Sequence, residues 1–278
     1  MGSPDIESIA DGLLRTRNAE VNLAFRVQGE GPAVVLLHGT TANHAVWTSV
    51  ADDLTASATV ISLDQRGHGR SDKPADGYTG SDFAADVVTV LDALGVEQAL
   101  VGGHSLGGRN AWVAAALHPD RVTGALVVDY TPFVERQVLD ELDARVAGGF
   151  RSFQDLDEIH AYLRGRYPRI LVEAVERRAR WGYRQAPDGS WQALADAGAM
   201  RQLIEGFRTP WLDEFEAVRV PMTHLRGADS RIVTPAAWAA AQEARPGDRW
   251  IEIAGADHYI PEEHPERITA ELLRLLSA

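Results

Sequence analysis

A five-residue motif of the form G-x-S-x-G limits what this chain can fold into more than any other feature. Residues 103–107 read Gly-His-Ser-Leu-Gly, directly after an apolar run over 98–102 and directly before a helix-like stretch over 108–117. A serine at such a strand-turn-helix junction takes strained backbone angles, and the two glycines let strand and helix approach closely enough to expose its hydroxyl. Ser105 is therefore a candidate nucleophile. A serine that only caps a helix after a glycine-rich turn would give the same five residues.

The composition indicates a globular enzyme. With 278 residues, 45% of them apolar, the chain can bury one large core or one core with a modest insertion. It has no apolar run of about 18 residues and no basic and apolar leader, so we expect neither a membrane span nor export. The absence of cysteine excludes a disulfide framework, a thiolate nucleophile and a cysteine-ligated metal, and it suits a cytoplasmic location. The formal net charge of −13 argues against nucleic acid as a partner.

Strand-like and helix-like stretches alternate near both ends of the chain, which predicts an α/β fold with a mostly parallel sheet and helices on both faces. The expected elements are residues 33–38, 44–54, 59–64, 82–94, 98–104, 109–117 and 122–129, and later 218–227, 235–244, 249–254 and 265–276.

Between these two groups the pattern changes to helix-like segments with little strand character. Examples are 138–147, 155–164 and 170–180. A Pro-Asp-Gly sequence at 187–189 indicates a turn inside this stretch. We therefore expect residues 1–132 and 216–278 to form one α/β core, with residues 133–215 inserted as a helical cap.

A second motif lies where it could supply hydrogen-bond donors to the negative charge that develops on a substrate attacked by Ser105. Residues 36–40 read Leu-Leu-His-Gly-Thr and follow the first strongly apolar strand, where a hydrolase places the loop that supplies one oxyanion N–H. We assign that donor to the backbone of Thr40 and the second donor to Leu106, the residue after the serine. A His-Gly turn after a strand is common by itself, but its position upstream of the serine favours the catalytic interpretation.

Ser105 also needs a general base, and the chain holds nine histidines. His258 lies just beyond the last expected strand, which allows the chain order nucleophile, acid, histidine. The other histidines stand in turn motifs or lack a partner pattern, and no H-E-x-x-H or similar metal spacing occurs. We therefore expect His258 to be the base, and we expect no metal site.

Two aspartates compete for the acid that orients this histidine. Asp129 closes one expected strand and Asp229 follows another, and the carboxyl ends of parallel strands meet at one edge of a sheet. Hydrolases with the later acid commonly read G-x-x-D-x-x-V-P, whereas here Ser230 stands in the acid position and Asp229 falls one residue early. A one-residue slip turns a side chain well away. We favour Asp129, keep Asp229 as the alternative, and interpret Asp257, next to His258, as a loop residue.

Four segments together make the chain resemble the α/β-hydrolase fold family over nearly its whole length. They are His38-Gly39, residues 64–72, residues 103–107 and His258. The resemblance implies a hydrolase of this fold, but the fold carries many chemistries, so these motifs do not name a substrate. Dehalogenases and epoxide hydrolases of the family usually carry aspartate where this chain has Ser105, which argues against both.

A narrower resemblance within that family is to the (E)-2-(acetamidomethylene)succinate hydrolases, a group of amidohydrolases of vitamin B6 degradation. The segments that carry it are 107–110, 128–132, 165–168 and 255–259. The resemblance implies that the acid follows the sixth strand, where Asp129 stands. It also implies that arginines of the cap bind substrate carboxylates, and the equivalents here are Arg145, Arg166 and Tyr167.

Arginine chemistry agrees with that implication, because a guanidinium can pair with both oxygens of a carboxylate. Any single one of the twelve arginines within residues 133–215 could equally lie on a solvated helix face. Pro168 restricts the residue before it to extended angles, so Arg166 and Tyr167 are expected to leave their helix at a fixed kink. We also expect Ser230 and His104 to contact the substrate.

These residues predict a serine hydrolase that cleaves an amide of a small, anionic substrate through an acyl-enzyme. His258 would take the Ser105 proton, Asp129 would hold the imidazole, and the amides of Thr40 and Leu106 would bind the oxyanion. The narrower resemblance implies (E)-2-(acetamidomethylene)succinate as substrate, with succinate semialdehyde, acetate, ammonia and carbon dioxide as products. No metal or organic cofactor is required.

Other functions fit the same residues. A small-molecule carboxylesterase would use the same triad beneath a cap that recognises a neutral group. A ligand receptor and a cofactor-independent oxygenase also occur on this scaffold and stay as further alternatives. The sequence leaves a homodimer open.

Overall fold

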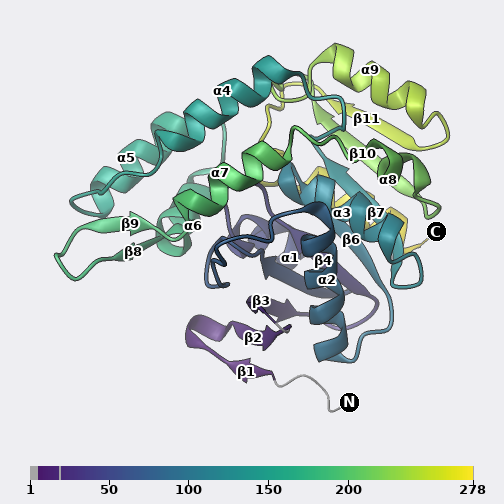
Figure 1. The fold of residues 1–278 in the computed structure, drawn as a ribbon. Helices are drawn as coiled ribbons and strands as arrows, with labels where there is room; N and C mark the ends of the chain where they lie inside the picture. The colour runs from purple at the N-terminus through teal and green to yellow at the C-terminus, as the bar shows by residue number, and fades with distance from the viewer. Residues whose placement is uncertain (1–5, 19, 278) are drawn as a thin grey trace.

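A nine-stranded sheet forms the centre of the protein (Figure 1). The computed structural model describes residues 6–18 and 20–277. The strands lie in the spatial order β1-β2-β3-β5-β4-β6-β7-β10-β11. Their bounds are Glu7–Ser8 (β1), Leu14–Arg17 (β2), Asn22–Gln28 (β3), Ala33–Leu37 (β4), Thr59–Asp64 (β5), Ala99–His104 (β6), Val122–Val128 (β7), Met222–Gly227 (β10) and Arg249–Ile253 (β11).

The strands from β5 to β11 in this order run parallel, and β1, β2 and β3 add an antiparallel edge. The central strands β4 and β6 are buried almost throughout, because helices cover both faces of a parallel sheet. The prediction of a mostly parallel α/β sheet is confirmed. It does not include the three antiparallel strands.

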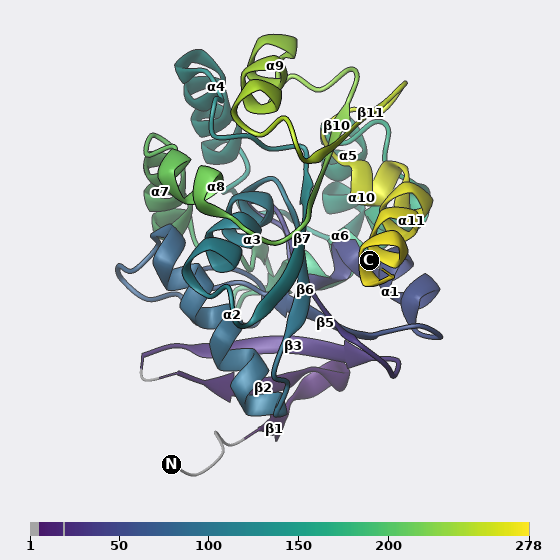
Figure 2. The ribbon, with the colours of Figure 1, turned by 90° about the vertical axis from the view of Figure 1, so that its right-hand side faces the viewer.

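Helices cover the sheet on both faces (Figure 2). α2 and α3 pack together on one face, and α1 and α11 pack together on the other. In α11 the buried residues Ile268, Leu272 and Leu275 recur at helical spacing and form one apolar stripe. The bounds of the helices outside the β7–β10 connection are Ala10–Gly12 (η1, 3-10), His44–Trp47 (η2, 3-10), Thr48–Leu54 (α1), Gly80–Leu94 (α2), Leu106–Leu117 (α3), Pro235–Ala244 (α9), Ile260–Glu263 (α10) and Pro265–Leu276 (α11).

The connection between β7 and β10 reaches over the carboxyl ends of the parallel strands (Figure 1). Its elements are α4 (Arg136–Ala147), α5 (Leu156–Arg166), α6 (Val172–Gly182), β8 (Tyr183–Gln185), β9 (Trp191–Ala193), α7 (Ala197–Gly206) and α8 (Leu212–Ala217). We call residues 133–215 of this connection the cap. The expected turn at 187–189 joins β8 to β9, with Gly189 at φ 88°. The hairpin itself departs from a purely helical cap, because strands of three residues are too short to show an alternating pattern.

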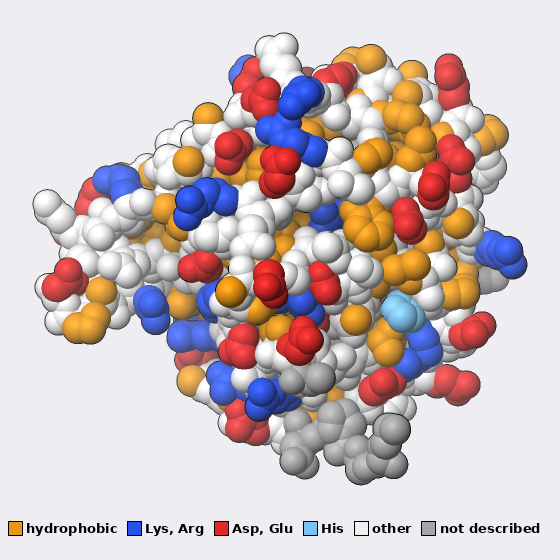
Figure 3. Space-filling model, in the orientation of Figure 1, with side chains coloured by type: hydrophobic (Ala, Val, Ile, Leu, Met, Phe, Trp, Pro, Cys, Tyr) orange, Lys and Arg blue, Asp and Glu red, His pale blue; other side chains and the backbone are white. Residues whose placement is uncertain are grey.

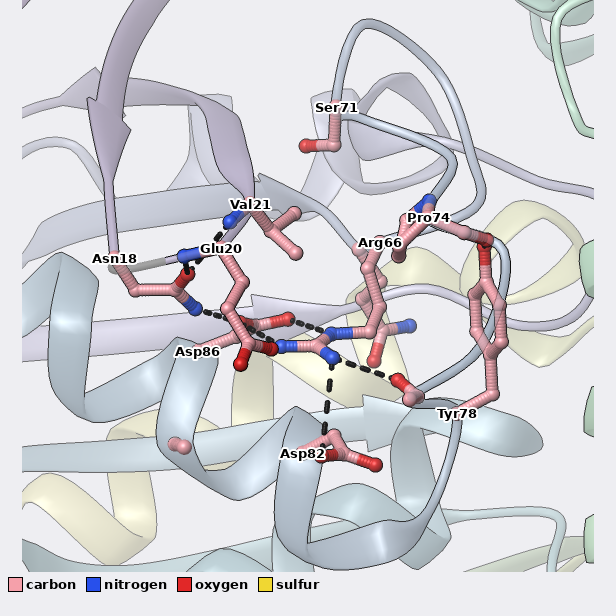
Figure 4. A network of polar contacts seen from close by, with 12 residues as sticks. Asn18, Glu20, Val21, Arg66, Ser71, Pro74, Tyr78, Asp82 and Asp86 are labelled. Atoms are coloured by element: carbon pink, nitrogen blue, oxygen red, sulfur yellow. Dashed lines mark hydrogen bonds and ion pairs between the residues drawn. The ribbon is translucent and has the colours of Figure 1, made fainter.

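A buried ion pair fastens the loop after β5 to α2 (Figure 4). Arg66 donates to both carboxylate oxygens of Asp86, at 2.7 Å from Nε and from Nη2, and to the Gly77 carbonyl at 2.6 Å. The Asn18 side chain donates to Asp86 as well, at 2.9 Å. Breaking a buried pair of this kind costs about 3–5 kcal/mol. The loop after β5 is therefore held in one position beside the end of β4.

The surface carries charges of both signs. Figure 3 shows acidic and basic side chains interspersed over the face that it presents, with no large field of one sign. Within residues 6–18 and 20–277, no helix is long and apolar enough to cross a membrane. The same part of the chain contains no group of three histidines or carboxylates placed to hold a metal ion.

Candidate active site

Ser105 stands at the sharp turn between β6 and α3. Its backbone angles are φ 53° and ψ −116°, a conformation that residues with a side chain rarely adopt. The flanking glycines are required by space: a Cβ on Gly103 would lie 1.9 Å from the Gly107 carbonyl oxygen, and one on Gly107 would lie 2.0 Å from the Leu37 carbonyl oxygen. The strand-turn-helix expected from the motif is present, and it presents the serine at the carboxyl end of the sheet.

Two backbone N–H groups lie beside this serine. Thr40 follows β4 and Leu106 opens α3, and neither N–H has a hydrogen-bond acceptor among the residues that the structure describes. The next N–H along the loop, that of Thr41, donates to His68 Nε2 at 3.2 Å. A Cβ on Gly39 would lie 3.3 Å from the Ser105 Cβ, so the loop touches the elbow. One of these N–H groups belongs to the residue next to Ser105 and the other to the loop that touches the elbow, and both are donors of the kind that an oxyanion hole uses.

The loop after β4 is braced by a buried chain of polar groups. The Gln65 N–H donates to His38 Nε2 at 3.0 Å, so the proton of this imidazole sits on Nδ1, which donates to the Gly39 carbonyl at 2.8 Å. The Gln65 side chain donates to the His38 carbonyl at 2.6 Å and accepts from Asn110 of α3 at 2.7 Å. Burial lowers the pKa of His38 to about 4, so the imidazole is neutral. The brace ties the loop after β4 to α3, the helix that begins after the serine.

A cavity lies between the end of the sheet and the cap, and we call it the catalytic cavity. Its lining consists of Gly39, Thr40, Thr41, Ala42, His104, Ser105, Leu142, Arg145, Val146, Arg166, Arg178, His258 and Tyr259. The cap helices α4, α5 and α6 each contribute one arginine to this lining, and no carboxylate side chain among residues 6–18 and 20–277 belongs to it. The cavity therefore has a hydroxyl and an imidazole on the sheet side and three guanidinium groups on the cap side.

His258 lies in the loop after β11, and a carboxylate fixes its ring. Nδ1 donates to Asp129 Oδ2 at 2.7 Å, which leaves Nε2 as the nitrogen that can accept a proton. Burial and the positive charges of Arg145 and Arg178 lower the pKa of His258 to about 3, so the imidazole is neutral, as a general base must be. His258 and Ser105 line the same cavity, and within the described residues no hydrogen bond joins them. Such contacts are often long in a structure without substrate.

Asp129 comes directly after β7 and is completely buried. Its φ is 51°, and its N–H donates to the Leu225 carbonyl of β10 at 2.8 Å. Besides the His258 ring, its carboxylate accepts the Gly227 N–H at Oδ1, at 2.9 Å, and the Ser230 hydroxyl at Oδ2, at 2.5 Å. Burial raises the pKa of Asp129 to about 8 against the opposing effect of these donors. The structure thus brings together the aspartate and the histidine that the sequence favours.

The alternative acid, Asp229, faces a different partner. Its carboxylate pairs with Arg169 Nη1 at 2.7 Å, and both side chains are about half exposed. Asp257 accepts the backbone N–H of His258 at 2.8 Å rather than a proton of its ring. Of the three aspartates considered from the sequence, Asp129 alone bonds to the imidazole.

Ser230 and His104, both expected to contact the substrate, have their polar groups engaged elsewhere. The Ser230 hydroxyl donates to Asp129 and lies behind the acid, outside the lining of the catalytic cavity. His104 does line the cavity, but its Nε2 donates to the His258 carbonyl at 2.7 Å. Burial holds the pKa of His104 well below its usual value. The structure therefore offers the Ser230 hydroxyl to Asp129 instead of to a substrate, because Ser230 stands at the position after β10 that faces the end of β7.

Arg145 and Arg166 face the catalytic cavity without a carboxylate partner. Arg166 donates from Nη1 to the Arg145 carbonyl and from Nε to the Tyr167 hydroxyl, both at 3.0 Å. Arg145 Nη2 lies 3.4 Å from the Arg166 carbonyl. Among the described residues, no Asp or Glu oxygen comes within 4.0 Å of either guanidinium. Neither guanidinium is paired with a carboxylate of these residues, and the forked donors of both suit one.

Arg178 is a third cation of the cavity, and the sequence interpretation missed it. Its side chain is 8% exposed and donates from Nε to both oxygens of Glu262, at 2.8 and 3.0 Å, and from Nη2 to one of them. Glu262 belongs to α10, so this pair joins the cap to the core. A signal for Arg178 was present, because it interrupts the helical stripe of buried Ala174, Val175 and Ala179.

The sheet and this site define a hydrolase of the α/β fold. Residues 32–265 match the model of the alpha/beta hydrolase fold family, and the chain belongs to that family. It is 40% identical over 246 residues to a 2-(acetamidomethylene)succinate hydrolase of Mesorhizobium japonicum, a match that covers 88% of each chain. A crystal structure of E-2-(acetamidomethylene)succinate hydrolase has 38% identity and a TM-score of 0.90, covering 93% of this chain and 96% of that one.

A more distant relative matches a smaller part. Epoxide hydrolase B of Mycobacterium tuberculosis is 42% identical over 113 residues, which cover 40% of this chain and 32% of that one. The resemblance stated from the motifs, including the narrower one, is confirmed by these comparisons. The protein is an enzyme of the hydrolase class.

Proposed function

We propose that the protein is a serine hydrolase that cleaves the amide C–N bond of a small substrate bearing carboxylates. One observation carries the proposal: Arg145 and Arg166, without a carboxylate of their own among the described residues, line the same cavity as Ser105 and His258. A bound carboxylate would supply the counter-charge in bidentate geometry. Similarity to the relatives named above supports (E)-2-(acetamidomethylene)succinate, a dicarboxylate, as the substrate.

Acylation begins as the Ser105 hydroxyl attacks the amide carbonyl carbon. His258 Nε2 accepts the hydroxyl proton while the new C–O bond forms, and Asp129 stabilises the resulting imidazolium through its Nδ1–H. The N–H groups of Thr40 and Leu106 bind the oxyanion. His258 then gives the proton to the leaving nitrogen, and the C–N bond breaks.

Deacylation uses the same groups. His258 takes a proton from a water molecule while the water oxygen bonds to the acyl carbon on Ser105. The bond between this carbon and Ser105 Oγ then breaks, His258 returns the proton to Oγ, and acetate leaves. On the proposed substrate the released nitrogen belongs to an enamine conjugated to a carboxylate, which departs more easily than an alkylamine. A second water then displaces ammonia from the enamine, and loss of carbon dioxide leaves succinate semialdehyde.

Ammonia release from (E)-2-(acetamidomethylene)succinate tests the proposal. We expect the wild-type protein to release ammonia and acetate in equal amounts. Ser105→Ala should lower kcat by about four to six orders of magnitude, because a triad without its nucleophile retains only binding and the oxyanion hole. Full activity in Ser105→Ala would exclude the acyl-enzyme.

A parallel assay with p-nitrophenyl acetate separates the amidase from a carboxylesterase. We expect a much higher kcat/KM for the dicarboxylate, since the neutral ester gives Arg145 and Arg166 nothing to bind. A higher kcat/KM for the ester would instead favour the carboxylesterase. If the protein turns over neither the dicarboxylate nor the ester, the proposed function itself is contradicted.

A further inference from the structure

Ser230 lies where two neighbouring strands of the sheet end. β7 and β10 pair in parallel with Val128 opposite Leu225, so the residues that follow the two strands lie side by side. Asp129 is the first residue after β7, and Ser230 is the third after β10. The two side chains meet at 2.5 Å, although 101 positions separate them in the chain.

The hydrogen bonds of the Ser230 hydroxyl fix the direction of its proton. Oγ accepts the N–H groups of Ile232 and Val233, each at 3.2 Å. A hydroxyl has two lone pairs and one proton, so the proton is left for Asp129 Oδ2. That oxygen is also the one that accepts His258 Nδ1–H, at 2.7 Å. Ser230 therefore holds the carboxylate oxygen that orients the base.

We propose that Ser230 is a positioning residue of the active site: the bond from its hydroxyl favours the carboxylate form of Asp129 over the protonated form and holds Oδ2 toward the His258 ring. It acts through Asp129 and touches no substrate. The inference rests on the proposed function, because that function makes Asp129 the acid and His258 the base.

A proton taken up by the His258–Asp129 pair ends activity, whichever group holds it. On His258 the proton occupies Nε2. On Asp129 it turns the carboxyl into a donor toward Nδ1, which moves the imidazole proton to Nε2. The apparent pKa belongs to the pair, and burial already raises the pKa of Asp129 to about 8 with the Ser230 donor in place. Loss of that donor raises it further.

Other charged groups face Asp129 from β10 and from the loop after β11. Arg226 of β10 lowers the pKa of Asp129, and Asp257 raises it. Arg226 is itself bonded to the Val233 carbonyl at 2.7 Å and to Glu252. These groups stay in place when only the hydroxyl at position 230 is removed, so a change in the pH profile reports on that hydroxyl.

The variants Ser230→Val and Ser230→Thr form a matched pair, because their side chains have nearly the same shape and differ in the hydroxyl. We measure kcat/KM for p-nitrophenyl acetate across the pH range. The acid limb is the part of the pH profile in which kcat/KM rises with pH. In Ser230→Val this limb should move up by about one to two pH units, so kcat/KM should fall about ten- to a hundredfold at neutral pH and recover at high pH. Ser230→Thr should keep the wild-type limb.

Thr234 provides a control in the same loop. Its hydroxyl accepts the Ala237 N–H at 3.1 Å and donates to Glu135, away from Asp129. Thr234→Val should therefore leave the acid limb unchanged. A readout without turnover is the low-field proton resonance of His258 Nδ1–H, which should shift in Ser230→Val and stay in Ser230→Thr.

An equal loss at every pH in Ser230→Val, or one limb shared by the Val and Thr variants, would overturn the role of the hydroxyl. If Ser230→Val does not fold, Ser230→Ala takes its place, and failure of both while Thr234→Val folds would mean that Ser230 only supports the loop. The proposed function fails differently, through an inactive wild-type protein or an active Ser105→Ala.

Discussion

The two sides of the catalytic cavity differ in whether their polar and charged groups have protein partners. On the sheet side the polar groups are held by protein partners: Asp129 accepts from three donors, and the loop after β4 is braced through His38 and Gln65. On the cap side Arg145 and Arg166 have no carboxylate partner among the described residues. Under the proposed function, the sheet side supplies the groups that act on the acyl carbon and the cap side supplies the charges that bind the substrate.

The largest effect should follow from breaking the sheet side. Asp129→Asn keeps the shape of the acid but holds the imidazole in the wrong tautomer, so kcat should fall by about three to four orders of magnitude. The fall should be the same for the dicarboxylate and for p-nitrophenyl acetate, because the triad serves both. Steady-state kinetics with each substrate measures this.

Asp229→Asn is the matched control for that prediction. Asp229 pairs with Arg169 at the surface, so its loss should leave kcat near the wild-type value. A large fall in Asp229→Asn with an active Asp129→Asn would exchange the roles of the two aspartates and refute the geometry described for β7 and β10.

The next effect concerns stability. Arg178 is the arginine of the cap side that, like the polar groups of the sheet side, is held by a protein partner. Glu262→Ala leaves Arg178 buried without its carboxylate, and breaking a buried pair costs about 3–5 kcal/mol of unfolding free energy. Urea unfolding followed by tryptophan fluorescence measures the loss. Asp229→Ala, which breaks the exposed link between cap and core, should leave the unfolding midpoint unchanged. Equal losses in both variants would contradict the distinction between the buried and the exposed pair.

Much of the sheet side could be predicted from the sequence because its signals are local. β5, α9 and α11 have the expected bounds, since an apolar run or a helical stripe between turn residues defines an element without distant contacts. β3 carries an alternation of Leu23, Phe25 and Val27 that was available and overlooked. β1 has two residues, too few for any pattern.

The site was predictable where a motif or a register fixes a residue, and less so where contacts are long-range. The elbow motif marks Ser105. Asp229 lies one residue before the usual acid position, and this slip favours Asp129 as the acid. Arg178 depends on Glu262, 84 positions away, and nothing local distinguishes a buried arginine from its solvated neighbours except a stripe of small apolar residues. Asp129, the partner of Ser230, is more distant still, at 101 positions.

A smaller effect should follow from breaking the cap side, and it should depend on the substrate. Arg166→Ala removes a charged donor for a carboxylate, so kcat/KM for the dicarboxylate should fall by about ten- to a hundredfold. The value for p-nitrophenyl acetate should stay near the wild type. An equal loss on both substrates would indicate that Arg166 supports the fold of the cap rather than binding the substrate.

The smallest effect would show how the cap side acts on the chemistry of the sheet side. The positive charge of Arg145 helps burial to hold the pKa of His258 down, so Arg145→Ala raises the proton affinity of the His258–Asp129 pair. Because the base must be unprotonated, the acid limb of kcat/KM for p-nitrophenyl acetate should move to higher pH, by about one unit at most. Arg136→Ala, on the exposed face of the same helix, should leave the limb in place. A limb that stays put in Arg145→Ala, or moves to lower pH, would mean that the two sides are electrostatically independent. A shift as predicted would mean that a bound carboxylate, by neutralising Arg145, itself raises the basicity of His258 when the substrate arrives.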